Sequence, residues 1–194
     1  MRTLVVSSRQ FINSLAYLEM KKTWMGFLFA FVLPIVVVLA WWGIFRHATI
    51  SETTSAPIHF AWIEFNGDLA DLPDAQDKLR RILLADHIAP GNPVVILLSD
   101  PRHTAKNRQH AEAGFEIPPQ TKLPSSIRVS DIPTRKVLRS EVRASILLAP
   151  SIAYQGLFNY LKSSGRPFKL PTVEVYTPGN SINEMGILTV DMAD

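Results

Sequence analysis

The sequence contains no cysteine and nine glycines among its 194 residues. Without cysteine there can be neither a disulfide framework nor a thiolate zinc site. None of the glycines stands in the G-x-G-x-x-G or G-x-x-x-x-G-K spacing that cradles phosphates, which excludes the common nucleotide-binding loops. The lack of cysteine does not identify a compartment, because an outward-facing bacterial domain can fold without disulfides.

Patterns typical of catalysis or metal binding are also missing. The five histidines are scattered, and no two of them stand at helical spacing with an acid between them. Asp68, Asp71, Asp74 and Asp77 recur at intervals of three, but acids at the start of a helix commonly complement its dipole. The prediction is a protein that is not an enzyme and has no catalytic, cofactor-binding or metal-binding residues.

Positive charge is in excess only at the N-terminus. Residues 1–22 carry four basic side chains against one acid, a net charge of +3, which equals the net charge of the whole chain. The remaining Lys and Arg side chains therefore balance the remaining acids. Because the excess lies next to an apolar run, it indicates membrane topology rather than a nucleic-acid surface, and no nucleic-acid partner is expected.

The longest apolar segment extends from Trp24 to Phe45 without a charged side chain. A helix of this length rises about 33 Å, which matches a hydrocarbon core of about 30 Å. Signal peptides have shorter apolar regions that end at small residues, whereas this run ends in bulky and basic side chains. The sequence therefore predicts a single-pass inner-membrane protein, with its N-terminus cytoplasmic and its C-terminal domain periplasmic.

Two sets of residues have predicted roles in this span. Gly26, Ala30 and Pro34 lie four residues apart and share a helix face, so they are predicted to pack against other membrane helices. A proline in a membrane helix can also be merely tolerated, and the two interpretations have equal weight. The predicted interface anchors are Trp24, Trp41 and Trp42.

Four segments are predicted along the chain. Residues 1–22 form a cytoplasmic amphipathic lead-in, and residues 23–45 form the transmembrane helix. Residues 46–56 are a polar linker, and residues 57–194 are an extracytoplasmic α/β domain without a visible internal repeat.

Within the domain, apolar runs alternate with amphipathic segments, which favours an α/β or α+β fold with a mixed sheet. Residues 100–126 are expected to form a long loop. The predicted core residues are Ile96, Leu98, Ile146, Leu148, Val173 and Val175. The predicted strands are 58–65, 93–99, 127–131, 144–150 and 172–179, and the predicted helices are 74–87, 133–141 and 151–165.

Several segments together resemble the N-terminal part of type-2 ABC exporter permeases. These are the first span with its Leu33-Pro34 pair, the strand "IHFAWIEFNGDL", the segment "ILLAPSIAYQGLFNYL" and the turn "TPGNS". The resemblance implies a first span followed by an extracytoplasmic α/β domain. It also implies partners among other membrane subunits and an ATPase.

The chain departs from that family because no further span follows the last turn before Asp194. The sequence therefore leaves two alternative functions as predictions. The first is a non-enzymatic subunit of an ABC-type export permease, truncated or split, which acts through packing of its span and a periplasmic docking domain. The second is a bitopic structural subunit of a bacterial envelope or secretion assembly.

Overall fold

The structure is a computed structural model that describes residues 24, 26–121, 123, 127–180 and 184–194. It divides into two compact units, Met1–Ile44 and Phe45–Asp194. The predicted lead-in over residues 1–22 lies outside the described residues.

The N-terminal unit contains described helical residues up to Trp41, after which Gly43 adopts a φ of 92° in a turn. Among the residues that the structure describes, no helix is both long enough and apolar enough to cross a membrane. The predicted transmembrane helix over residues 23–45 is therefore wrong, and so is the predicted inner-membrane location with a periplasmic domain.

The residues assigned roles in that span lie in or beside the same helical stretch. Trp24, Trp41 and Trp42 are exposed, and a Cβ built on Gly26 would meet open space. No contact in the described part of the chain tests the packing predicted for Gly26, Ala30 and Pro34.

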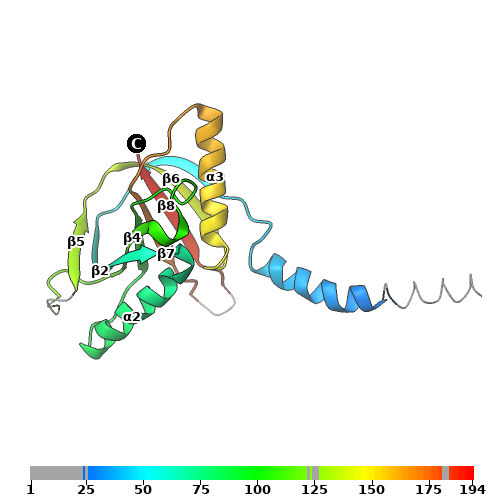
Figure 1. The fold of residues 1–194 in the computed structure, drawn as a ribbon, viewed down its shortest axis with the longest axis horizontal. Coiled ribbons are helices and arrows are strands. Elements are labelled where there is room, and N and C mark those ends of the chain that lie inside the picture. Colours follow the sequence, from blue (N-terminus) through cyan, green and yellow to red (C-terminus); the bar gives the residue numbers. More distant parts are fainter. Residues whose placement is uncertain (1–23, 25, 122, 124–126, 181–183) are drawn as a thin grey trace, which may run out of the picture. The chain divides into compact units, whose positions relative to one another are not determined.

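The second unit is an α+β domain built on one eight-stranded sheet, with strand order β1-β6-β8-β7-β3-β4-β2-β5 (Figure 1). Every neighbouring pair of strands is antiparallel. The strands are β1 Thr49–Thr54, β2 Ile58–Gly67, β3 Pro93–Leu97, β4 Gln109–Glu116, β5 Arg128–Ile132, β6 Lys136–Arg143, β7 Thr172–Thr177 and β8 Ile187–Ala193. The helices are α2 Leu72–Ala85 and α3 Ala149–Ser164, with short 3-10 helices η1 Leu69–Asp71 and η2 Lys106–Arg108.

The topology contains a repeat that the sequence does not reveal. The units β2-α2-β3-β4 and β6-α3-β7-β8 have the same order of elements, and in each the last strand lies between the other two. The second strands of the two units, β3 and β7, are neighbours at the centre of the sheet. β1 and β5 each precede one unit but pair with the first strand of the other, so the two halves are joined at both ends of the sheet.

A stripe of small and apolar residues explains how helix α3 packs on the sheet. Ala149, Ala153, Leu157 and Leu161 are spaced four apart and are all buried, so one face of the helix packs on the sheet. Gly165 ends the helix in the left-handed conformation, with φ 67°, which glycine adopts without a Cβ penalty. Helix α2 buries Leu79 and Leu83 in the same way.

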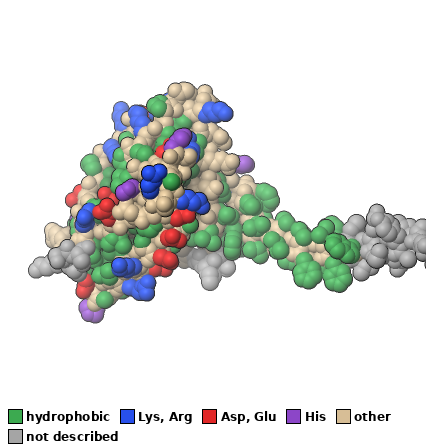
Figure 2. Space-filling view, viewed as in Figure 1, with side chains coloured by type: hydrophobic (Ala, Val, Ile, Leu, Met, Phe, Trp, Pro, Cys, Tyr) green, Lys and Arg blue, Asp and Glu red, His purple; other side chains and the backbone are tan. Residues whose placement is uncertain are grey.

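Charge on the domain surface is mixed. On the face that Figure 2 shows, basic and acidic side chains lie among one another rather than in separate patches. This arrangement matches the balanced charge counted from the sequence beyond residue 22.

Several predicted elements differ from the observed ones. The predicted helix 133–141 is mostly strand β6, and the predicted strand 144–150 is a turn that leads into α3. The expected loop 100–126 contains β4, the expected linker 46–56 contains β1, and β8 was not predicted. In each case strand pairing or helix packing within the sheet domain overrides the local sequence preference.

The predicted core is correct in part. Ile96 and Val173 are buried on the central strands. Leu98 is 45% exposed because it lies beyond the end of β3, and Ile146 is 50% exposed because it lies in the turn before α3.

Candidate ligand-binding site

A cavity of about 770 Å³ lies over the two central strands, at the junction of the two repeated units. Helix α2 packs on β2 and β4, whereas α3 packs on β1, β6 and β8. Neither helix packs closely on β3 or β7, so the sheet between them is left uncovered. The volume is within the range of about 300–1,000 Å³ that is typical of small-molecule sites.

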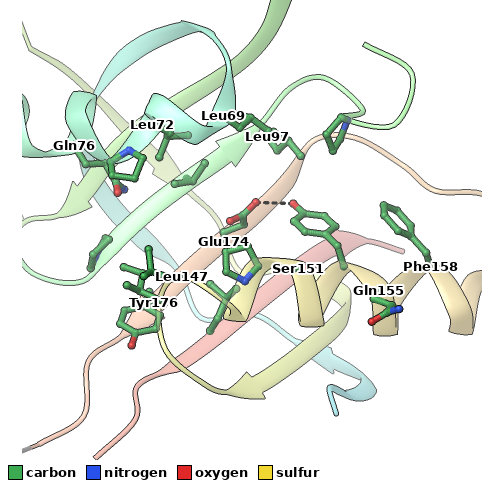
Figure 3. A pocket seen from close by; sticks show the side chains of 18 of the residues that line it. Leu69, Leu72, Gln76, Leu97, Leu147, Ser151, Gln155, Phe158, Glu174 and Tyr176 are labelled. Carbon is green, nitrogen blue, oxygen red and sulfur yellow. Dashed lines mark hydrogen bonds between the residues drawn. The ribbon is translucent and has the colours of Figure 1, made fainter. Parts of the chain in front are cut away.

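The cavity wall is mainly apolar and draws on both units. β3 contributes Val95 and Leu97 to the lining, and β7 contributes Tyr176. Figure 3 shows Leu97 and Tyr176 among the lining side chains. Helix α3 contributes Tyr154 and Phe158 to the wall, and the turn before α3 contributes Ile146 and Leu147. Further lining side chains from η1 and α2 are Leu69, Leu72, Pro73 and Gln76.

Glu174 is the one acidic side chain in this lining. It stands at the middle of β7 and is paired across the ladder with Val95. Burial among apolar groups raises the pKa of its carboxyl to about 7, although a hydrogen bond from Tyr154 acts in the opposite direction. No described Lys, Arg or His forms a salt bridge with Glu174. Its negative charge is therefore not neutralised by a described side chain.

Tyr154 holds the carboxyl of Glu174 in place. Its hydroxyl donates to Glu174 Oε1 over 2.7 Å, which Figure 3 draws as a dashed line, and lies 2.7 Å from Thr172 Oγ1. Burial raises the pKa of Tyr154 well above its usual value, and the charge of Glu174 adds to this effect. The tyrosine therefore stays neutral and acts as a hydrogen-bond donor.

An arginine from the segment after β3 completes the wall. The Arg102 guanidinium lies 3.8 Å from the ring centroid of Phe158 and 5.1 Å from that of Phe168. Asp100 accepts hydrogen bonds from Arg102 Nε at 3.0 Å and from Nη2 at 2.6 Å. These bonds hold the pKa of Asp100 well below its usual range, so this pair remains ionised.

The sequence interpretation did not identify these residues as a site. Glu174 lies in a predicted strand, "TVEVYTPG", where alternation also suits an acid that faces solvent. Tyr154 and Phe158 stand four residues apart on the predicted helix 151–165, which indicates an aromatic face but not a cavity. The acids noted at intervals of three lie elsewhere, and Asp68 accepts a hydrogen bond from the backbone N–H of Ala70 at the start of η1.

Solved structures with a similar fold exist, although no protein-family model and no curated protein match the chain. The EcmrR–DNA complex matches at TM-score 0.59 and 11% identity, over 99% of this chain and 76% of that chain. The EcmrR C-terminal domain matches at TM-score 0.59 and 12% identity, over 75% of this chain and 96% of that chain. SAV2435 bound to tetraphenylphosphonium matches at TM-score 0.51 and 9% identity, over 74% of this chain and 92% of that chain.

These likenesses correct the predicted family and function. The chain resembles domains such as that of EcmrR, not the first part of an ABC exporter permease, and the short apolar motifs behind that resemblance occur in a different fold. The predicted function, either a permease subunit or a bitopic envelope subunit, is therefore wrong as well. The predicted partners, a membrane, other membrane subunits and an ATPase, have no support.

The prediction that the protein has no nucleic-acid partner is also contradicted. It was based on balanced charge, yet EcmrR, which has this fold, forms a complex with DNA.

Proposed function

We propose that the domain Phe45–Asp194 binds an apolar, aromatic cation in the cavity between its two helices. The observation that carries this proposal is Glu174, a carboxyl in an apolar wall without a described basic partner. A buried carboxylate is costly unless an opposite charge pairs with it, and a ligand cation can supply that charge.

The aromatic side chains support the same ligand class. Tyr154 and Tyr176 line the cavity, and aromatic rings attract cations through their quadrupoles. The apolar remainder of the wall suits a ligand with large hydrophobic groups. SAV2435, a protein of this fold, was captured with tetraphenylphosphonium, which is such a cation.

The proposed role is recognition rather than catalysis. The lining contains one carboxyl and two tyrosines, and it includes no histidine or lysine that could act as a base beside a nucleophile. The likeness to EcmrR, a protein seen bound to DNA, supports use of this recognition in regulation.

Calorimetric titration of the purified full chain tests this proposal. The probes are tetraphenylphosphonium and triphenylphosphine oxide, which is uncharged and of similar aromatic character. We expect the cation to bind and the neutral compound to bind at least about tenfold more weakly, because only the cation pairs with Glu174. Glu174→Gln should remove this preference.

The matched control is Glu141→Gln, which changes an exposed acid on β6 outside the cavity. It should leave both affinities unchanged. Equal binding of the two probes to the natural chain, or no binding of the cation, would contradict the proposal.

A further inference from the structure

The wall of the cavity already contains a cation from the chain itself. Arg102 places its guanidinium 3.8 Å from the centroid of the Phe158 ring, within the distance at which a cation is attracted to a ring face. The ring of Phe168 lies 5.1 Å from the same group, and the two rings meet edge to face at 5.1 Å. This aromatic corner is therefore occupied by Arg102.

Asp100 fixes Arg102 in this position. Its carboxylate accepts from Nε and Nη2 of Arg102 and also from the backbone N–H of Arg102 at 2.9 Å. The exposed side chain of His103 also contacts Asp100, at 3.1 Å. The side chain of Asp100 is only 18% exposed, so water screens its charge little. The Arg102 guanidinium, which donates two hydrogen bonds to it, is its main neutralising partner.

One carboxylate in the wall and one behind it are therefore in different situations, because Glu174 lines the cavity and Asp100 binds the lining residue Arg102. Glu174 has no described basic partner, whereas Asp100 is neutralised by Arg102. Tyr154 connects the two regions, because its hydroxyl donates to Glu174 and its ring lies 5.7 Å from that of Phe158. A ligand with one positive charge can satisfy Glu174, but a second positive charge would meet Arg102.

We propose that Arg102 is a specificity-determining residue that restricts the cavity to ligands with a single positive charge. It holds the second cation position, formed by Asp100, Phe158 and Phe168, with its own guanidinium. This inference rests on the proposed binding of cations. Removal of the guanidinium would leave a carboxylate beside two ring faces, which is a site for a second ligand charge.

The test compares two flat, two-ring ligands that differ by one charge. They are N-methyl-phenylpyridinium, a monocation, and dimethyl-bipyridinium, a dication. Calorimetric titration of the natural chain should show preference for the monocation by about tenfold or more. Arg102→Gln should bind the dication about tenfold more tightly than the natural chain does, and the preference of the natural chain for the monocation should be lost.

Two further variants separate the charge effect from a general disturbance. In the double variant Asp100→Asn with Arg102→Gln the second carboxylate is gone, so the gain for the dication should disappear. Arg128→Gln is the matched control, because Arg128 also lies over a ring, that of Trp62 at 5.1 Å, and is absent from the cavity lining. It should leave both affinities unchanged, and thermal melting checks that each variant is folded.

The outcomes distinguish this inference from the proposed function. If the natural chain binds neither cation, the proposed function fails. If it binds the monocation but binds the dication equally well, only the role of Arg102 fails, and this comparison needs no variant. An Arg102→Gln protein that is folded and keeps the original preference also overturns the inference.

Discussion

The affinity for a permanent cation should depend on pH through Glu174. Burial raises the pKa of this carboxyl to about 7, so the group changes charge near neutrality. The neighbouring groups do not titrate there, because the pKa of Tyr154 is raised well above its usual value and that of Asp100 is held far below its usual range. Tetraphenylphosphonium carries a charge that is independent of pH, so a change in its affinity reports on the protein.

The size of the effect follows from the ionised fraction. With a pKa of about 7, Glu174 is ionised in about one tenth of molecules at about pH 6 and in about nine tenths at about pH 8. If only the ionised form binds, the apparent dissociation constant is the intrinsic one divided by that fraction. Affinity should therefore rise about tenfold over these two pH units, with its midpoint near pH 7.

Equilibrium titration at several pH values, at constant ionic strength, measures this profile. Glu174→Gln should bind more weakly and without the pH dependence, because the amide stays uncharged. Glu141→Gln should keep the full profile. A flat profile for the natural chain, or the same profile in Glu174→Gln, would show that this carboxyl does not pair with the cation.

Three other changes have defined outcomes. Tyr154→Phe removes the hydroxyl that donates to Glu174 over 2.7 Å, so the pKa of Glu174 and the midpoint of the binding profile should both rise, as pH titration with tetraphenylphosphonium would show. Without ligand, ionisation of Glu174 destabilises the fold as pH rises from 4.5 to about 7. Glu174→Gln should therefore stabilise the protein by up to about 3 kcal/mol at about pH 8 and by little near pH 4.5, as urea unfolding would measure. Leu157→Ala removes a fully buried side chain from α3 and should lower the free energy of unfolding by about 2–5 kcal/mol in the same assay, whereas exposed Leu84→Ala should cost far less.

Elements with strong local signals were predicted well. The helix expected at 151–165 corresponds to α3, since it has a regular apolar stripe and a glycine that ends it. The strands expected at 58–65, 93–99 and 172–179 correspond to β2, β3 and β7 within a few residues. These segments combine β-branched residues with clear turn residues at their ends, so local preference and tertiary structure agree.

The wrong elements are those in which two local signals conflict. Residues 144–150 form a short apolar run, typical of a buried strand, but Pro150 stands in the first turn of α3, where proline is favoured. The helix predicted at 133–141 begins with a proline, yet most of its residues belong to β6, which pairs with both β1 and β8. Pairing with strands far along the chain decides this segment, and a single sequence does not contain that information.

The candidate site could not be predicted because it depends on the position of the two helices. Successive side chains of a strand point to opposite faces of the sheet. Thr172, Glu174 and Tyr176 share one face of β7 and Val173 lies on the other, so the strand pattern alone suggests that the more polar set faces solvent. In the structure Thr172 is fully buried and Glu174 lines the cavity, which places that set on the side of the helices.

The repeated topology gives a physical reason why a cavity forms at this place. Each unit has one helix, which packs over its own first and last strands, and the second strands β3 and β7 meet at the centre. An ordinary core would fill the space over these strands with long apolar side chains. Here the ladder position of Val95 faces Glu174, so one unit contributes an apolar residue and the other an acid. If the cavity binds a cation as proposed, this asymmetry predicts one orientation of the ligand, with its positive charge toward β7 and its hydrophobic groups toward β3.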